Sequence, residues 1–143
     1  MAIRALSLTS TRRYESKYDP ARGTPDATVF VIGTLDSRIY GRLRDLATRV
    51  NVDRNRPDDE VSTSVNLAEV AYETVAYGLR GIERFVDDAG DEVRFRTKRR
   101  YHGGQHYDAV DDEVLKQLPQ QVISELAEEI GRDNELTEAE AKN

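Results

Sequence analysis

Residues 75–95 constrain the fold more than any other stretch, because a helix end and a change of chain direction follow each other closely within them. Gly78 predicts the helix end, since glycine can close a helix in the left-handed conformation without a Cβ penalty. Gly81 predicts a second sharp change of direction. We therefore expect a helix that leads directly into a strand.

A hairpin is predicted immediately after this change of direction. Residues 82–86 are typical of a strand, and residues 87–90 (Asp-Asp-Ala-Gly) predict a tight turn with positive φ at Gly90. Residues 93–95 alternate apolar and polar, as the residues of a half-buried return strand do.

The strongest strand signal lies at residues 28–32, where consecutive apolar and largely β-branched side chains predict burial on both faces. Gly33 interrupts this run, and Asp36 is expected to cap a helix over residues 36–50. The apolar residues of that helix recur at spacings that place them on one face. They are Ile39, Leu43, Leu46 and Val50.

A polar loop over residues 51–64 is expected to precede the next helix. Its acidic residues lack the spacing and the glycine of a calcium-binding loop, so we expect no metal there. Asn66 and Glu69 predict a capping box at the start of the helix, and Val65 and Val70 the accompanying hydrophobic staple.

Near the C-terminal end, Asp111 predicts the cap of a helical turn, Pro119 the start of a longer helix, and Gly131 its end. Between these two helices and the first hairpin, residues 103–104 (Gly-Gly) predict a two-residue turn. It would pair His102 with Gln105 and Tyr101 with His106. The two histidines would then project from opposite faces, so we expect no shared metal.

The chain divides into an extended N-terminal arm (residues 1–27), one domain (residues 28–131) and an acidic C-terminal tail (residues 132–143). The prolines of the Asp-Pro and Thr-Pro pairs stop a helix from running through the arm. For the domain we predict an α+β fold of three to four helices packed on a small, mainly antiparallel sheet. A parallel crossover from residues 28–32 to residues 82–86 is the alternative.

Charge is distributed unevenly over a chain with a net charge of −6. Residues 1–22 have five basic and two acidic side chains, whereas residues 108–143 have eleven acidic and three basic ones. This asymmetry suits contact between copies, so we expect a homo-oligomer; two independently solvated ends are the alternative. The acidic balance argues against nucleic-acid binding, and no apolar run predicts a membrane span.

Candidate partner-binding residues lie in the arm and on the return strand. Those in the arm are Ile3, Leu6, Leu8, Arg12 and Arg13. Those on the strand would form a cationic stripe, comprising Arg94, Arg96, Lys98 and Arg100. The stripe either docks an acidic partner or is an exposed face whose charges prevent edge-to-edge aggregation. No arrangement of acids, serines or histidines suggests catalysis, so we expect neither enzymatic activity nor a cofactor.

Several motifs in order carry a family resemblance. They are Tyr77-Gly78-Leu79-Arg80-Gly81-Ile82, the acidic glycine turn at residues 87–92, Leu118-Pro119, and Val122-Ile123-Ser124-Glu125-Leu126-Ala127. Over roughly residues 25–143 the chain resembles small morphogenesis proteins of tailed bacteriophages, in particular tail assembly chaperones. Ile82 stands where that pattern has an aromatic residue.

The resemblance implies a non-enzymatic protein that binds other virion proteins, of the tail or the capsid, in the host cytoplasm during assembly. The alternative is a structural component of the virion, such as a head decoration protein or a neck (connector) protein. Under either reading, we expect the arm over residues 1–27 to dock between copies or on a major virion protein. The rest of the chain is then expected to fold without it.

Overall fold

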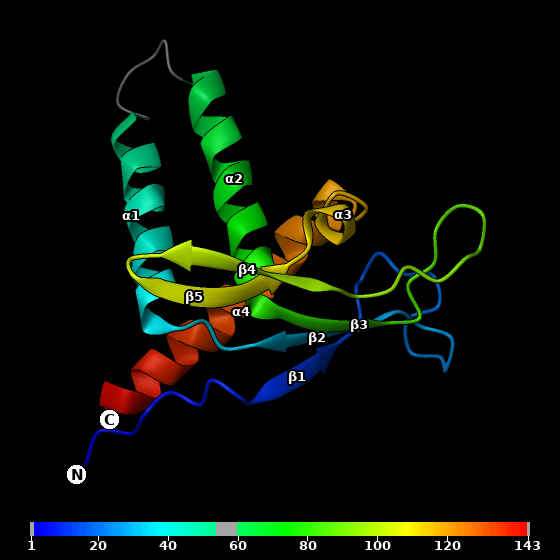
Figure 1. Cartoon of the computed structure of the whole chain (residues 1–143), viewed down its shortest axis with the longest axis horizontal. Coiled ribbons are helices and arrows are strands. Elements are labelled where there is room, and N and C mark those ends of the chain that lie inside the picture. Colours follow the sequence, from blue (N-terminus) through cyan, green and yellow to red (C-terminus); the bar gives the residue numbers. More distant parts are fainter. Residues whose placement is uncertain (1, 54–59, 143) are drawn as a thin grey trace.

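The strand predicted at residues 28–32 lies in the middle of a three-stranded antiparallel sheet. In the computed structural model, β2 (Val29–Gly33) pairs on one side with β1 (Thr11–Tyr14) and on the other with β3 (Leu79–Glu83) (Figure 1). The structure describes residues 2–53 and 60–142, with side chains over residues 2–48 and 67–135. Because β2 and β3 run antiparallel, the alternative of a parallel crossover is wrong.

A second sheet is the hairpin of β4 (Thr97–His102) and β5 (Gln105–Val110). The Gly-Gly turn predicted from the sequence is confirmed, including its register: His102 pairs with Gln105 and Tyr101 with His106. Both turn glycines have positive φ, as a two-residue hairpin turn requires. In Figure 1 the hairpin crosses in front of the helices, with β5 nearer to β3 than β4 is.

Within the described residues, four helices complete the α+β fold, as predicted. They are α1 (Ser37–Asp53), α2 (Glu60–Gly78), α3 (Asp112–Leu115) and α4 (Gln120–Lys142). Asp36 caps α1 by accepting hydrogen bonds from the backbone N–H groups of Arg38 and Ile39, and Asp111 caps α3 through Glu113 N. Both caps were predicted, because the signal lies within a few residues of the helix start.

The core lies where α2 packs against α4, with β2 and β5 closing it. The fully buried side chains come from every layer, so that one apolar cluster joins both sheets to the helices. They include Ile32, Leu35, Ile39, Val75, Val110, Val114, Leu115, Ile123, Leu126 and Ile130. No helix within the described ranges is long and apolar enough to span a membrane.

Gly78 ends α2 as predicted, but the predicted reason is wrong because its φ is not positive. A Cβ at this position would lie 2.7 Å from Cδ1 and 2.8 Å from Cγ2 of Ile130 in α4. Gly78 therefore allows the two helices to approach closely. Gly81 makes no turn and continues β3.

The hairpin predicted around residues 87–90 is only partly formed. Gly90 has the expected positive φ of 86°, but regular pairing of β3 ends at Glu83, before the turn. Arg84 follows with φ of 57°. Two hydrogen bonds hold this conformation: Arg84 Nε donates to Ala27 O, and Thr28 Oγ1 donates to the backbone carbonyl of Arg84. Beyond it, a single bridge joins Val86 to Glu92, so residues 93–95 form no regular return strand.

Two helix limits differ from those predicted. α2 begins at Glu60, so Asn66 lies inside the helix. The predicted cap at Asn66 and the predicted hydrophobic staple of Val65 and Val70 are therefore wrong. α1 reaches Asp53, so both ends of the predicted 51–64 loop are helical, while residues 54–59 lie outside the described ranges. Packing of α1 against α2 adds helical turns that a local capping signal does not indicate.

The third difference is at Gly131, which does not end α4. The helix continues to Lys142, so the tail over residues 132–142 is helical. Asn134 anchors this part, because its buried side chain accepts a hydrogen bond from Leu35 N and donates one to Ile130 O. The remaining residues are mostly good helix formers, which favour continuation.

We predict that Gly131→Ala raises the free energy of unfolding by about 0.5–1 kcal/mol, since glycine inside a helix costs about that much relative to alanine. No atom lies within 4 Å of the added Cβ. Gly90→Ala is the matched control: its Cβ also meets nothing, but its positive φ makes alanine destabilising by about 1 kcal/mol. Urea unfolding of both variants measures this; destabilisation by Gly131→Ala would contradict a helical position 131.

Candidate functional site

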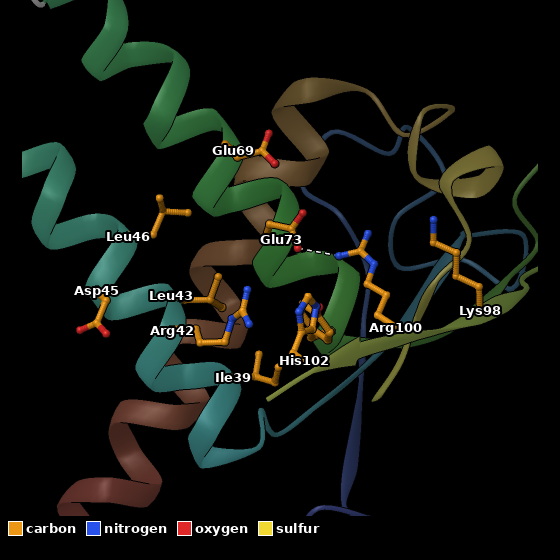
Figure 2. Close-up of a pocket in the computed structure, with 11 residues that line it drawn as sticks. Ile39, Arg42, Leu43, Asp45, Leu46, Glu69, Glu73, Lys98, Arg100 and His102 are labelled. Atoms are coloured by element: carbon orange, nitrogen blue, oxygen red, sulfur yellow. Dashed lines mark hydrogen bonds and ion pairs between the residues drawn. The ribbon is translucent and has the colours of Figure 1, made fainter. Parts of the chain in front are cut away.

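An open groove of about 680 Å³ lies between α1, α2 and β4. Figure 2 shows α1 forming one side of it, α2 the back, and the side chains of β4 the remaining side. The groove combines one apolar wall with one polar wall, so it can contact both kinds of group on a ligand.

The apolar wall comes from Ile39, Leu43 and Leu46 of α1. Their spacing, predicted to form one helical face, turns them toward α2 and β4 (Figure 2). Ile39 and Leu43 are buried, whereas Leu46 is half-buried. The same helical face thus contributes to the core at its N-terminal end and to the groove farther along.

The polar wall is a network on α2 and β4. The Tyr77 hydroxyl lies 2.6 Å from Nε2 of His102, and the guanidinium of Arg100 lies over the Tyr77 ring, 5.3 Å from its centroid. Arg100 also donates to Glu73 at 2.6 Å. This network holds the four side chains in fixed positions along the groove.

Electrostatics favour an uncharged His102. Burial, together with the nearby positive charges of Arg42 and Arg100, lowers the pKa of His102 below its ordinary value of 6.5, and Glu73 only partly opposes this. A neutral imidazole can accept or donate one hydrogen bond at each nitrogen. Near neutral pH the groove therefore offers His102 as a hydrogen-bonding group and not as a cation.

We predict that Arg42→Gln raises the pKa of His102, because it removes one of the two positive charges that oppose protonation. An NMR titration of the imidazole Cε1 proton measures the change. Arg44→Gln is the control on the same helix, since Arg44 stacks on Tyr40 and does not line the groove. Equal His102 titrations in both variants would contradict this placement of Arg42.

Sequence reasoning missed the two α2 residues that organise the polar wall, Glu73 and Tyr77. Both lie in an expected helix, but their roles depend on β4, which is distant in sequence. The only available signal was their helical spacing of four, which puts them on one face.

The predicted cationic stripe is divided by the structure. Lys98 and Arg100 are paired within the chain: Lys98 pairs with Asp112 at the surface, and Arg100 pairs with Glu73 and lies 3.6 Å from Asp112. Arg94 and Arg96 precede β4 and are exposed. The prediction that all four share one strand face is wrong, because the regular strand begins only at Thr97.

The arm contacts its own chain over much of its length. Arg12 binds Glu129 and Asp133 of α4 at 2.9 and 3.0 Å, and Arg13 pairs with Glu83 of β3. The basic head and the acidic end of the chain thus meet within one molecule. Residues 11–14 also complete the sheet as β1, which argues against the expectation that the rest of the chain folds without the arm.

The apolar residues at the start of the arm are largely exposed. Ile3 is 84% exposed, while Leu6 and Leu8 lie beside shallow hollows near the start of α1 and are about half exposed. The structure therefore does not bring these residues together with the groove. They remain candidates for contact with another molecule.

The histidines lie on opposite sides of the hairpin, as the register required. His106 packs against Tyr101, with ring centroids 5.0 Å apart, on the side away from Tyr77 and His102. Among the described residues, no group of three or more histidine, aspartate and glutamate side chains is arranged to hold a metal ion.

Comparisons with models of protein families, with curated proteins and with solved structures gave no match.

Proposed function

We propose that this chain is a non-enzymatic morphogenesis protein of a tailed bacteriophage, similar to tail assembly chaperones, and that it binds other virion proteins through the groove between α1, α2 and β4. The motif order described from the sequence supports the phage family. The composition of the groove supports protein binding.

The single observation that carries the binding role is the pairing of an apolar wall with a fixed tyrosine and arginine. Tyr77, which is largely buried, and Arg100 line the groove together with the α1 side chains, and each is held by bonds within the protein. Tyrosine and arginine are the residue types that most often dominate protein–protein binding energy. Because their positions are already fixed, little conformational entropy is lost when a partner binds.

Infected cells provide the test of this function. An affinity-tagged copy of the chain is recovered during assembly, and purified virions are analysed separately by quantitative mass spectrometry. Recovery of an identified tail protein with the chain, and absence of the chain from virions, is the result expected of an assembly chaperone in the host cytoplasm. Recovery of no virion protein, combined with absence from particles, would contradict the proposal.

A structural component of the virion is the second candidate. The exposed start of the arm, with Ile3 almost fully accessible, favours it because such a segment can be buried between neighbouring subunits of an assembled particle. Stoichiometric presence in virions would select this candidate. Ultracentrifugation would then show whether isolated copies already form the expected homo-oligomer.

The role of the groove can be tested in the same cells. Leu46→Glu puts a charge on the apolar wall and should reduce recovery of the tail protein about tenfold or more, as expected when a charge faces an apolar contact. Thr48→Glu is the matched control, because Thr48 is an exposed residue of α1 outside the groove. Equal recovery with both variants would show that the partner binds elsewhere.

A further inference from the structure

We propose that the free edge of β4 binds an extended, acidic segment of a partner protein as an added antiparallel or parallel strand. This inference rests on the proposed function, since it specifies how a virion protein would bind. It draws on the pairing of β4, the position of the groove beside it, and the charges around it.

The edge of β4 is open to pairing. β4 pairs with β5, and no other described strand pairs with it. In an antiparallel hairpin with a two-residue turn, cross-strand residue pairs that are hydrogen-bonded alternate with pairs that are not, starting with a hydrogen-bonded pair next to the turn. The register then directs the backbone N–H and C=O groups of Thr97, Arg99 and Tyr101 away from β5. These are the groups to which an added strand bonds.

The groove lies directly alongside this edge. Lys98, Arg100 and His102 alternate with the edge-facing residues and line the groove (Figure 2). Side chains of an added strand also alternate, so every second one would lie on the same side as these three. Apolar side chains at those positions could reach the wall formed by Leu43 and Leu46.

Charge determines what the other side chains should be. Arg94, Arg96 and Arg99 are exposed, and none of them has a carboxylate partner among the described side chains. Asp108 lies opposite Arg99 across the hairpin and is the nearest acidic group in the register. Arg99, together with the two exposed arginines that precede β4, favours acidic residues on a partner, which steers association and selects against basic segments.

The acidic end of the same protein does not fit this description. It is helical from Gln120 to Lys142, and a helix cannot donate backbone bonds along a strand edge. A second copy would bring the same basic β4 edge, so an extended acidic segment of a different protein is the occupant that fits.

The test uses the full chain and a synthetic peptide of alternating valine and glutamate, followed by NMR. We expect chemical-shift changes and slower hydrogen exchange at the amides of Thr97, Arg99 and Tyr101. A peptide of alternating valine and lysine should bind at least about tenfold more weakly, because its lysines would be repelled by Arg99 and by the exposed arginines that precede β4. Slowed exchange at other amides only would overturn the proposal.

Arg99→Pro tests the edge itself. Proline removes the outward N–H and blocks strand addition, while the β4–β5 bonds remain because the N–H of residue 99 does not take part in them. We expect the peptide affinity to fall by about tenfold or more beyond the effect of Arg99→Ala, which removes only the charge. Thr97→Pro is the second variant should Arg99→Pro unfold.

Each remaining outcome is decisive. Equal peptide affinity in the proline and alanine variants would overturn strand addition. Stronger binding of an acidic helical peptide would show that the groove binds a helix. Loss of self-association in Arg99→Pro would show that a second copy pairs with the edge of β4. Either result would overturn the proposal. Failure to recover virion proteins from infected cells would instead contradict the proposed function without altering the peptide result.

Discussion

Glu125→Ala should lower the free energy of unfolding by about 3–5 kcal/mol, because it leaves several buried donors without an acceptor. The Glu125 carboxylate is buried and accepts bonds from Tyr14 at 2.6 Å, from Ser16 at 2.5 Å and from Lys17 N at 2.8 Å. These bonds join the segment after β1 to α4. Urea unfolding monitored by circular dichroism measures the loss.

Acidic pH should weaken the same contact. Burial alone would raise the pKa of Glu125, but the hydrogen bonds from Ser16, Tyr14 and Lys17 N outweigh burial and hold the pKa below its ordinary value of 4.5. A carboxylate with a depressed folded-state pKa stabilises the fold above its ordinary pKa. This contribution should therefore be present above about pH 4.5 and disappear as the pH falls through the lowered value.

Alkaline pH should weaken it for a different reason. Burial, followed by the hydrogen bond to Glu125, raises the pKa of Tyr14 from 10.0 to about 12. The folded protein favours the protonated phenol of Tyr14. Its contribution to the free energy of unfolding is therefore complete below pH 10 and is lost between about pH 10 and 12.

Glu125→Gln is the control for the acid effect, because it keeps the size of the side chain and cannot ionise. Its stability should not show the acid-dependent loss assigned to Glu125. Deletion of residues 1–18 should destabilise at least as much as Glu125→Ala, since it also removes β1 and the Arg12 ion pairs. A deletion with unchanged stability would show that the arm does not support the fold.

Gly78→Val should cost about 3 kcal/mol, the upper part of the range for overpacking a close-packed core. The new Cβ would overlap two branches of Ile130, which is fully buried in α4 and cannot turn aside. Gly81→Val is the matched control in β3, because its Cβ would meet Val31 at an ordinary 3.6 Å. Comparable stabilities of the two variants would contradict a required close approach at Gly78.

A second substitution distinguishes the clash between residues 78 and 130 from other effects of placing valine at the end of α2. Ile130→Ala alone should destabilise by about 2–5 kcal/mol through cavity formation. Combined with Gly78→Val, it leaves room for the valine, so the double variant should be more stable than the sum of the single effects by about 1–2 kcal/mol. Strict additivity would show that residues 78 and 130 do not interact.

The parts of the fold that were predicted correctly depend on local chemistry. The β2 run, the caps at Asp36 and Asp111 and the Gly103-Gly104 turn are each specified by a few neighbouring residues. At Gly78 the predicted helix end was correct, but the predicted cause was wrong. From the sequence, a glycine at a helix end does not reveal whether it is needed for a left-handed backbone conformation or for close packing against a neighbouring side chain.

The parts that were missed depend on residues far apart in the sequence. Thr11–Tyr14 have no apolar alternation of their own and become a strand only because β2 offers an edge. The groove was not predictable either, since α1, α2 and β4 come together only in the folded chain. Lys98 and Arg100 were expected to face either a partner or solvent, but Asp112 and Glu73 lie within reach of them.

The junction between β1 and α4 affects the order in which the chain can fold. Tyr14 and Glu125 are 111 residues apart, and Arg12 and Asp133 are 121 apart. During synthesis, the first strand therefore leaves the ribosome long before its partners on the last helix exist. Contacts of such separation form slowly, because the entropy of closing the intervening chain is lost before they contribute. Until α4 is released, the segment around residues 11–17 lacks its partners on that helix and is accessible to chaperones, proteases and neighbouring nascent chains.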